Sequence, residues 1–167
     1  IGEMAAHTGA AFVPYLEEVV TVLLQAADNW HPLVKAECAD AMASLVIPCI
    51  ADESGGTLEW EKGDVTGQSP LGPKTTMAVD VVLKALVTMM KDDTKDVVGK
   101  ACESIQGVIE LCGPHALASV ASDCLDNTYL ILAKEAPCQQ LEDYGEEFGD
   151  EDDDHDSFMT SVCDLVG

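Results

Sequence analysis

Residues 32–46 read PLVKAECADAMASLV, and residues 95–109 read KDVVGKACESIQGVI. Each segment carries apolar side chains at the alternating three- and four-residue spacing of one helix face. At an offset of 63 positions, small or apolar residues coincide and so do two acids: Val34 with Val97, Ala39 with Cys102, Asp40 with Glu103, Met42 with Ile105, Leu45 with Val108, and Val46 with Ile109. The two segments are therefore predicted to be equivalent helices of a repeated unit.

The period of this repeat indicates the kind of unit. A polar segment at 52–74, with five glycines and two prolines, lies inside the offset and is predicted to be a long surface loop. Trp60 is the aromatic residue in it, and it either anchors the loop to the body or acts in recognition. Without most of the loop, the period is about 40 to 45 residues, which is typical of two-helix HEAT or armadillo units. We expect an all-α fold, a HEAT/armadillo-like α-solenoid of antiparallel helix pairs.

The same spacing and the turn residues place the remaining helices. We expect a helix stub ending at Thr8-Gly9, and a helix from Pro32 that Pro48 kinks or ends. A last stub should begin at Ser157, and the six methionines should lie in the core. Further helices are expected at about 12–28, 75–90, 95–111 and 116–136. The predicted division is a half repeat at 1–30, repeats at 31–94 and 95–140, an acidic loop at 141–157, and the start of another repeat at 158–167. The first residues read as mid-helix, with no basic leader segment, so we expect an excised fragment.

The charge of the chain fixes the sign of any charged partner. The sequence has 31 acids, eight lysines and no arginine, and its net charge is −23. Ten of the acids fall within 142–156; without them, 21 acids remain against eight lysines, a net charge of −13. Such a surface attracts basic segments and repels phosphate. We therefore expect no nucleic acid partner and no anionic membrane partner.

No motif in the chain predicts catalysis, a cofactor or a metal. The phosphate-binding, dinucleotide-binding, serine-hydrolase and zinc-protease patterns are all missing from the sequence. The four histidines and seven cysteines are scattered, and we interpret the cysteines as small buried hydrophobes in a reducing compartment. Asp150, Asp152 and Asp154 imitate the first ligands of a Ca²⁺ loop, but the pattern does not continue. No apolar run approaches the length of about 18 to 20 residues that spans a bilayer.

The first residues resemble a known family. Residues 1–9, IGEMAAHTG, followed by FVPYL at 12–16, resemble importin-β (karyopherin-β) nuclear transport receptors, especially the importin-4 type. The resemblance implies a receptor that shuttles between cytoplasm and nucleus through the nuclear pore. It also implies basic protein cargo, such as histones and ribosomal proteins, released when Ran-GTP binds. In the full-length receptor, Ran and the FG nucleoporins would be the other partners.

The acids are the candidate cargo-binding residues. The run at 142–156 is either a solvated linker or a docking loop for basic segments, and acids on the second helix of each pair would continue the same charge. The candidates are Glu142, Asp143, Glu146, Glu147, Asp150, Glu151, Asp152, Asp153, Asp154 and Asp156 in the run, with Glu17, Glu18, Asp80, Asp123 and Asp126 on the helices. The alternative functions are another HEAT-repeat scaffold subunit and an acidic histone chaperone.

Overall fold

The computed structural model describes residues 1–29, 31–56, 58–60, 71–140 and 151–166, with the backbone alone described at 151–156 and 166. These residues form helices and no strand, so the predicted all-α class is confirmed. The elements are α1 (Gly2–Thr8), η1 (Gly9–Tyr15), α2 (Leu16–Ala27), α3 (Pro32–Ser44), α4 (Val46–Ser54), α5 (Pro73–Met89), α6 (Lys95–Cys112), η2 (Pro114–Ser119), α7 (Ala121–Leu132), α8 (Pro137–Gln140) and α9 (Glu151–Val166), where η marks a 3-10 helix.

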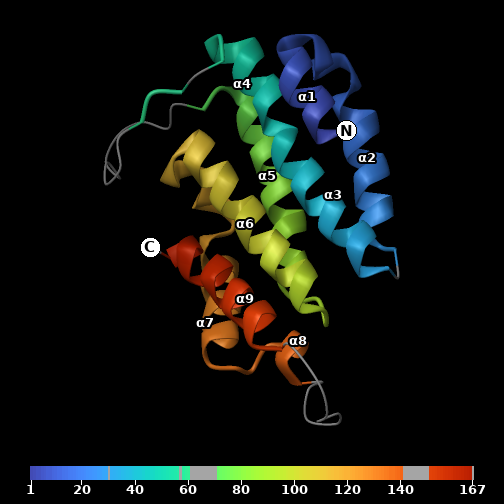
Figure 1. Ribbon diagram of the computed structural model, residues 1–167. Helices are drawn as coiled ribbons and strands as arrows, with labels where there is room; N and C mark the ends of the chain where they lie inside the picture. The colour runs from blue at the N-terminus through green and yellow to red at the C-terminus, as the bar shows by residue number, and fades with distance from the viewer. Residues whose placement is uncertain (30, 57, 61–70, 141–150, 167) are drawn as a thin grey trace.

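The helices are arranged in two rows (Figure 1). In the first row α1 packs on α3, α3 on α6, and α6 on α9. The second row consists of α2, α5 and α7. Helix α2 packs on α3 of the first row, α5 packs between α3 and α6, and α7 contacts α5. The predicted equivalent helices, α3 and α6, are therefore direct neighbours in one row, as stacked helix pairs require. The assignment of these pairs to the HEAT type stays a prediction.

Two prolines lie inside helical elements, and the helix boundaries near them differ from the predicted ones. Pro48 lies inside α4. Because Pro48 has no N–H to donate to the carbonyl of Ser44, the helix breaks at Leu45 and then continues to Ser54. The loop therefore begins at Gly55, whose φ of 74° ends α4 in the left-handed conformation, and not at residue 52. Pro14 similarly lies in η1, so that α2 begins at Leu16 instead of near residue 12.

Two further boundaries differ from the prediction. The helix expected at 116–136 is divided into η2 and the shorter α7. Helix α9 begins at Glu151, six residues before the expected start at Ser157, so the second part of the acidic run is helical and not loop. The described part of α9 is held on α6 by Phe158, which lies against Gly99, and by a hydrogen bond of 3.0 Å from the Ser161 hydroxyl to the Glu103 carboxylate.

Most apolar positions at helix spacing are buried in the core, but some are exposed. The buried stripe of α7 runs through Val120, Cys124 and Ile131 and includes the polar Asn127 and Thr128. Three large side chains of the same helix are exposed instead: Leu125, Tyr129 and Leu132. The prediction of core methionines was wrong for Met4 and Met77, of which 63% and 72% are exposed, whereas Met42, Met89 and Met90 are buried. On α5, Val81 is also exposed.

The two ends of the 55–72 loop are fixed to the body. The Glu53 carboxylate accepts hydrogen bonds from the backbone N–H groups of Lys74 and Thr75 and from the Thr75 hydroxyl, so it caps the first turn of α5. Gly72 is needed beside it, because a Cβ there would lie 2.3 Å from the carboxylate. The Trp60 indole N–H donates to the Glu110 carbonyl at 3.2 Å, which confirms the anchoring interpretation of Trp60.

One stretch of the described residues, Gly2–Ala27, is long and apolar enough to cross a membrane by length and composition, contrary to the sequence expectation. In this fold it is not one helix. Helices α1 and α2 run in opposite directions on either side of η1 (Figure 1). The longer of the two, α2, extends for about 18 Å, whereas a bilayer core is about 30 Å thick.

Candidate functional site

The acidic run can be placed only in part. Five of its acids lie outside the described residues: Glu142, Asp143, Glu146, Glu147 and Asp150. The other five have a described backbone in the first two turns of α9, and their side chains lie outside the description: Glu151, Asp152, Asp153, Asp154 and Asp156. The docking-loop hypothesis for the run is therefore untested by the structure.

The five candidate acids outside the run differ in their surroundings. Glu17, Glu18, Asp123 and Asp126 are exposed, and no ion pair involves them within the described part of the chain. Asp80 is different, because its carboxylate lies 2.8 Å from the Lys84 ammonium. The hydrogen bonds from Lys84 and then Ser119 lower the pKa of Asp80 despite some burial. Asp80 is thus occupied by groups of its own chain.

Two of these acids, Glu17 and Glu18, lie in the first turn of α2. Glu18 lines a cavity with Met4, Phe12 and Val19 at the outer edge of α1 and α2. Glu17 lies two turns before Leu24, which lines a different cavity together with α5. The acidic surface along the second helices stays a prediction.

Helix α7 presents the clearest combination of charge and apolar surface. Asp123 and Asp126 are exposed one turn apart. On the same helix Leu125 is 61% exposed and Tyr129 69% exposed. These four residues, which we call the α7 face, combine two carboxylates with an apolar side chain and an aromatic ring.

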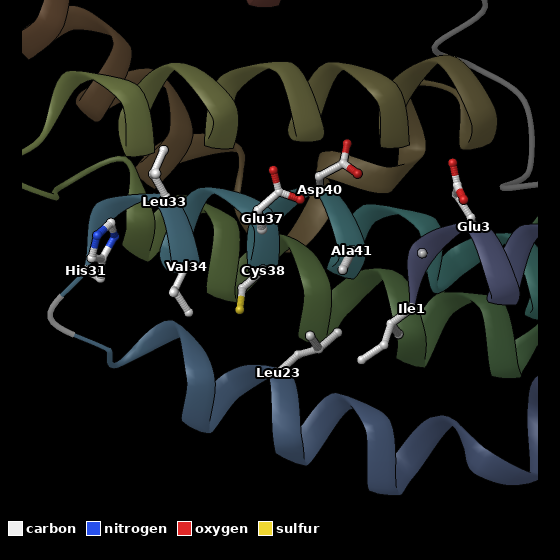
Figure 2. Close-up of a pocket in the computed structure, with 11 residues that line it drawn as sticks. Ile1, Glu3, Leu23, His31, Leu33, Val34, Glu37, Cys38, Asp40 and Ala41 are labelled. Atoms are coloured by element: carbon white, nitrogen blue, oxygen red, sulfur yellow. The ribbon is translucent and has the colours of Figure 1, made fainter.

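A second surface, not predicted from the sequence, is a groove of about 760 Å³ between α2 and α3 (Figure 2). Leu23 of α2 and Val34 and Cys38 of α3 point into it, and Ile1 closes the end at α1. The carboxylates of Glu3, Glu37 and Asp40 project along one edge. We call this feature the α2–α3 groove.

Beside the groove, the described part of α1 covers only one half of α3. Its seven residues extend for about 10 Å, whereas the thirteen residues of α3 extend for about 20 Å. Gly2 sits on the second half of α3: a Cβ there would lie 2.9 Å from the Ser44 hydroxyl and 3.3 Å from the Ala41 Cα. Among the described residues, no helix covers the first half of α3 on that side, where Leu33 is 62% exposed and Val34 39% exposed.

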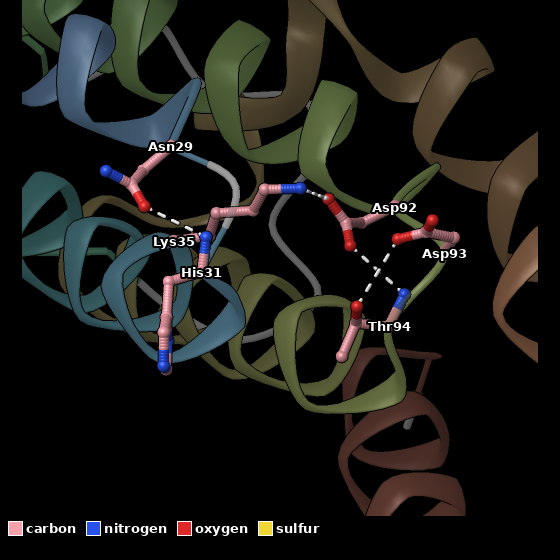
Figure 3. A network of polar contacts seen from close by, with 6 residues as sticks. All are labelled: Asn29, His31, Lys35, Asp92, Asp93 and Thr94. Carbon is pink, nitrogen blue, oxygen red and sulfur yellow. Dashed lines mark hydrogen bonds and ion pairs between the residues drawn. The ribbon is translucent and has the colours of Figure 1, made fainter.

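A polar network fixes the first turns of α3 relative to α5 and α6 (Figure 3). The Lys35 ammonium lies 2.6 Å from Asp92 Oδ2, and Asp92 Oδ1 accepts the Thr94 backbone N–H at 3.0 Å. Burial raises the pKa of Asp92, but the hydrogen bonds from Lys35 and Thr94 outweigh it and leave the pKa below its usual value. The backbone N–H of His31, just before α3, donates to the Asn29 side chain at 2.9 Å. The network therefore holds the α3 wall of the groove in place.

The potential metal ligands and the cysteines of the described residues can be placed in the fold. They contain no cluster of three or more potential metal ligands. Six cysteines are buried, as predicted, and Cys163 is exposed. Burial raises the pKa of Cys102 and of Cys112 to about 12, so neither thiol is a nucleophile at neutral pH.

Comparisons with known proteins leave the family open. No protein-family model matches the chain, and no curated protein matches it significantly. The resemblance of residues 1–16 to import receptors therefore stays a prediction.

Proposed function

We propose that this chain is a binding scaffold for basic protein segments and forms part of a nuclear import receptor of the importin-β family. The observation that carries the proposal is the α7 face. Asp123 and Asp126 have no lysine of the described residues within ion-pair distance, and Asp126 lies one turn before the exposed Tyr129 on the same helix. A lysine can place its ammonium on the carboxylates and its methylene chain on Leu125 and the ring.

The balance of charge within the fold supports the same partner. Four lysines are held by acids of this chain: Lys35 by Asp92, Lys74 by Asp52, Lys84 by Asp80 and Lys100 by Glu103. Because acids outnumber lysines almost four to one, many carboxylates have no internal partner. An extended segment with several lysines would reduce this self-repulsion as it binds, since like charges destabilise the compact state.

The strength of such binding would come from several weak contacts. One exposed ion pair contributes about 0 to 1 kcal/mol, and a cation–π contact at an exposed ring adds about 0.5 to 1 kcal/mol. Affinity should therefore fall steeply with salt, because exposed charges are screened within about 10 Å at 0.1 M ionic strength.

The test is a titration of a fluorescent lysine-rich histone-tail peptide against the chain and two charge-matched variants. Asp123→Asn/Asp126→Asn should weaken binding by about threefold to tenfold and flatten its salt dependence. The control, Asp28→Asn/Asp96→Asn, removes two exposed acids on other helices, at the end of α2 and in the first turn of α6, and should bind like the parent. Equal losses in both variants would mean that net charge alone attracts the peptide, and the proposed site would be rejected.

A second titration separates the import receptor from its alternatives. Release of the bound peptide on addition of Ran loaded with GTP, but not with GDP, supports a receptor segment that includes a Ran contact. Binding of histone peptides without any response to Ran favours an acidic histone chaperone or another helical scaffold.

A further inference from the structure

We infer that a cleft between α3 and α6 is a docking site for one lysine side chain of a partner protein, whose ammonium binds Asp40 and Ser104. In the first row α3 lies between α1 and α6, and α6 lies between α3 and α9, so the cleft is inside the row. We call it the α3–α6 cleft, and it is lined by Asp40, Ala43 and Ile47 on one side and by Ser104, Gly107 and Leu111 on the other. It shares no residue with the α7 face, so the inference does not rest on the proposed function.

A glycine opens the cleft between two helix faces. Positions 104, 107 and 111 are spaced by three and four residues, so they follow one face of α6, and positions 40 and 43 do the same on α3. At the centre of the α6 face stands Gly107, where an added Cβ would meet nothing within 4 Å. The missing side chain leaves a hollow of about 220 Å³ between the helices.

The size of the cleft limits its ligand to one side chain. At about 30 Å³ for each water, it has room for roughly seven waters. Pockets that take whole small molecules are larger, at about 300 to 1,000 Å³. The rim is open to solvent, because Asp40, Glu103 and Leu111 are exposed. An extended side chain can therefore enter from a segment that stays outside.

An unpaired hydroxyl lies in the wall of the cleft. Ser104 is 5% exposed, and its Oγ has no hydrogen-bond partner in the described part of the chain. Because Ser104 shares one face of α6 with Gly107 and Leu111, it lies toward the cleft. Burial of a hydroxyl without a hydrogen bond is unfavourable. A ligand that donates to this oxygen would remove the deficit.

The charge at the cleft favours a cation. The Asp40 carboxylate points toward α6 (Figure 2), and no described lysine lies within ion-pair distance of it. Both oxygens of Glu103 are occupied, by Lys100 at 2.5 Å and by the Ser161 hydroxyl at 3.0 Å. The hydrogen bond to Glu103, and then the charges of Asp40 and Glu37, raise the pKa of Lys100 despite some burial. One ammonium thus serves three carboxylates, and a local charge of −2 remains.

A lysine suits this arrangement better than an arginine. The ammonium has three donors that point in different directions, so it can reach Asp40 on one wall and Ser104 on the other. The donors of a guanidinium lie in one plane and suit a single carboxylate. The methylene stem of a lysine can also cover Leu111, which is 39% exposed at the rim.

The experiment is an NMR titration of the isotope-labelled chain with N-acetyl-lysine methylamide. The amide signals of Ser104 and Gly107 report binding at the cleft. A dissociation constant on the order of 1 mM is expected, because one exposed ion pair contributes little. N-acetyl-norleucine methylamide keeps the methylene stem without the ammonium and should bind at least about threefold more weakly. N-acetyl-arginine methylamide should also bind more weakly than the lysine derivative.

Three variants separate the hydroxyl, the charge and the space. Ser104→Ala should weaken binding by about threefold to tenfold without lowering the melting temperature, because the hydroxyl is unpaired in the free chain. Asp40→Asn should weaken binding by about twofold to fivefold. Gly107→Leu should abolish binding, because its side chain occupies the hollow, and circular dichroism checks that it folds. The charge-matched control, Asp28→Asn, removes an exposed acid at the end of α2, outside the cleft, and should bind like the parent.

The inference is overturned if the norleucine or arginine derivative binds as tightly as the lysine derivative, or if the Ser104 and Gly107 signals do not move. Equal losses in Asp40→Asn and Asp28→Asn would mean that net charge alone attracts the ligand. Unchanged binding to a folded Gly107→Leu variant would place the lysine elsewhere.

Two more ligands and one more variant complete the test. Binding of putrescine, a diamine without a peptide backbone, together with no binding of a five-residue peptide of glycines around one lysine, would assign the cleft to a free amine and overturn the partner protein. Asp123→Asn/Asp126→Asn should leave the lysine titration unchanged, because neither residue lines the cleft. Failure of this inference and failure of the proposed function are therefore distinguishable.

Discussion

Replacement of Lys35 by methionine should destabilise the fold through the carboxylate that it leaves behind. Lys35 Nζ lies 2.6 Å from Asp92 Oδ2, and the two side chains are 21% and 12% exposed. Methionine keeps the length of the lysine side chain but not its charge. Asp92 would keep the Thr94 backbone N–H on its other oxygen, and it would remain largely shielded from water.

The expected cost lies between two limits. Loss of one partner of a buried ion pair costs about 3 to 5 kcal/mol, and an exposed pair contributes about 0 to 1 kcal/mol. Since this pair is mostly but not fully shielded, we expect Lys35→Met to cost about 2 kcal/mol, or a fall of about 4 to 8 °C in the melting temperature of a chain of this size. Asp92→Asn should cost about 1 kcal/mol, because the long lysine side chain can turn its ammonium to solvent.

Urea unfolding followed by circular dichroism, at constant m value, measures these free energies. The double variant Lys35→Met/Asp92→Asn should cost about 2 kcal/mol, which leaves a coupling energy of about 1 kcal/mol. Lys84→Met is the matched control: its pair with Asp80 is 60% and 39% exposed and should contribute about 0.3 to 0.5 kcal/mol. A cost below about 0.5 kcal/mol for Lys35→Met, or simple additivity in the double variant, would refute the reasoning.

The pH dependence of stability gives a second measure of the same pair. The pKa of Asp92 is lowered in the folded state, so its contribution is fully present above the unfolded value of about 3.9. This contribution is lost as the pH falls through the lower, folded pKa, because protonation removes the charge that Lys35 binds. The parent should therefore lose more stability than the double variant below about pH 4, and parallel pH profiles would contradict this assignment.

Other consequences of the fold are equally open to measurement. Glu53→Ala should lower the free energy of unfolding in urea by about 1 to 2 kcal/mol, because three donors at the start of α5 lose their acceptor. Gly107→Ala should raise it by about 0.5 to 1 kcal/mol, since a Cβ in this mid-helix position meets nothing within 4 Å. Gly113→Ala should lower it, because φ is +77° there and a Cβ would lie 3.0 Å from the ring of Trp60; equal effects of the two alanines would contradict the backbone argument. At pH 8 a thiol reagent should label Cys163 at once and all seven cysteines only after unfolding, and rapid labelling of the native chain at several sites would exclude the described burial.

The sequence predicted the helices and the equivalence of α3 and α6, which pack side by side, but it did not predict all the helix ends. The 63-residue offset identified α3 and α6 as equivalent because stacked helices bury the same side. Apolar residues therefore recur at the same positions in both helices. The helix was predicted to kink or end at Pro48, but it breaks at Leu45. The reason is that the missing N–H of Pro48 affects the carbonyl four residues earlier, while Pro48 itself fits within α4. The early start of α9 was missed because a run of acids looks like solvated chain, although acids are favourable in the first turn of a helix.

The candidate surfaces were only partly predictable. That the chain is acidic, and that α7 carries Asp123 and Asp126, could be read from the residues. That Asp80 is held by Lys84 depends on the pairing of side chains on α5. That Glu18 lines a cavity with Met4 and Phe12 depends on how α2 packs beside α1 and η1.

The apolar periodicity of α3 does not predict burial correctly at the α2–α3 groove. Leu33 and Val34 belong to an apolar run that periodicity assigns to the core, yet both are exposed. Helix α3 contacts α1, α2, α5 and α6, so apolar residues occur nearly all around it, and only its first half lacks one of these neighbours. The periodicity of α3 therefore identifies its apolar residues and not which helices are present to cover each of them.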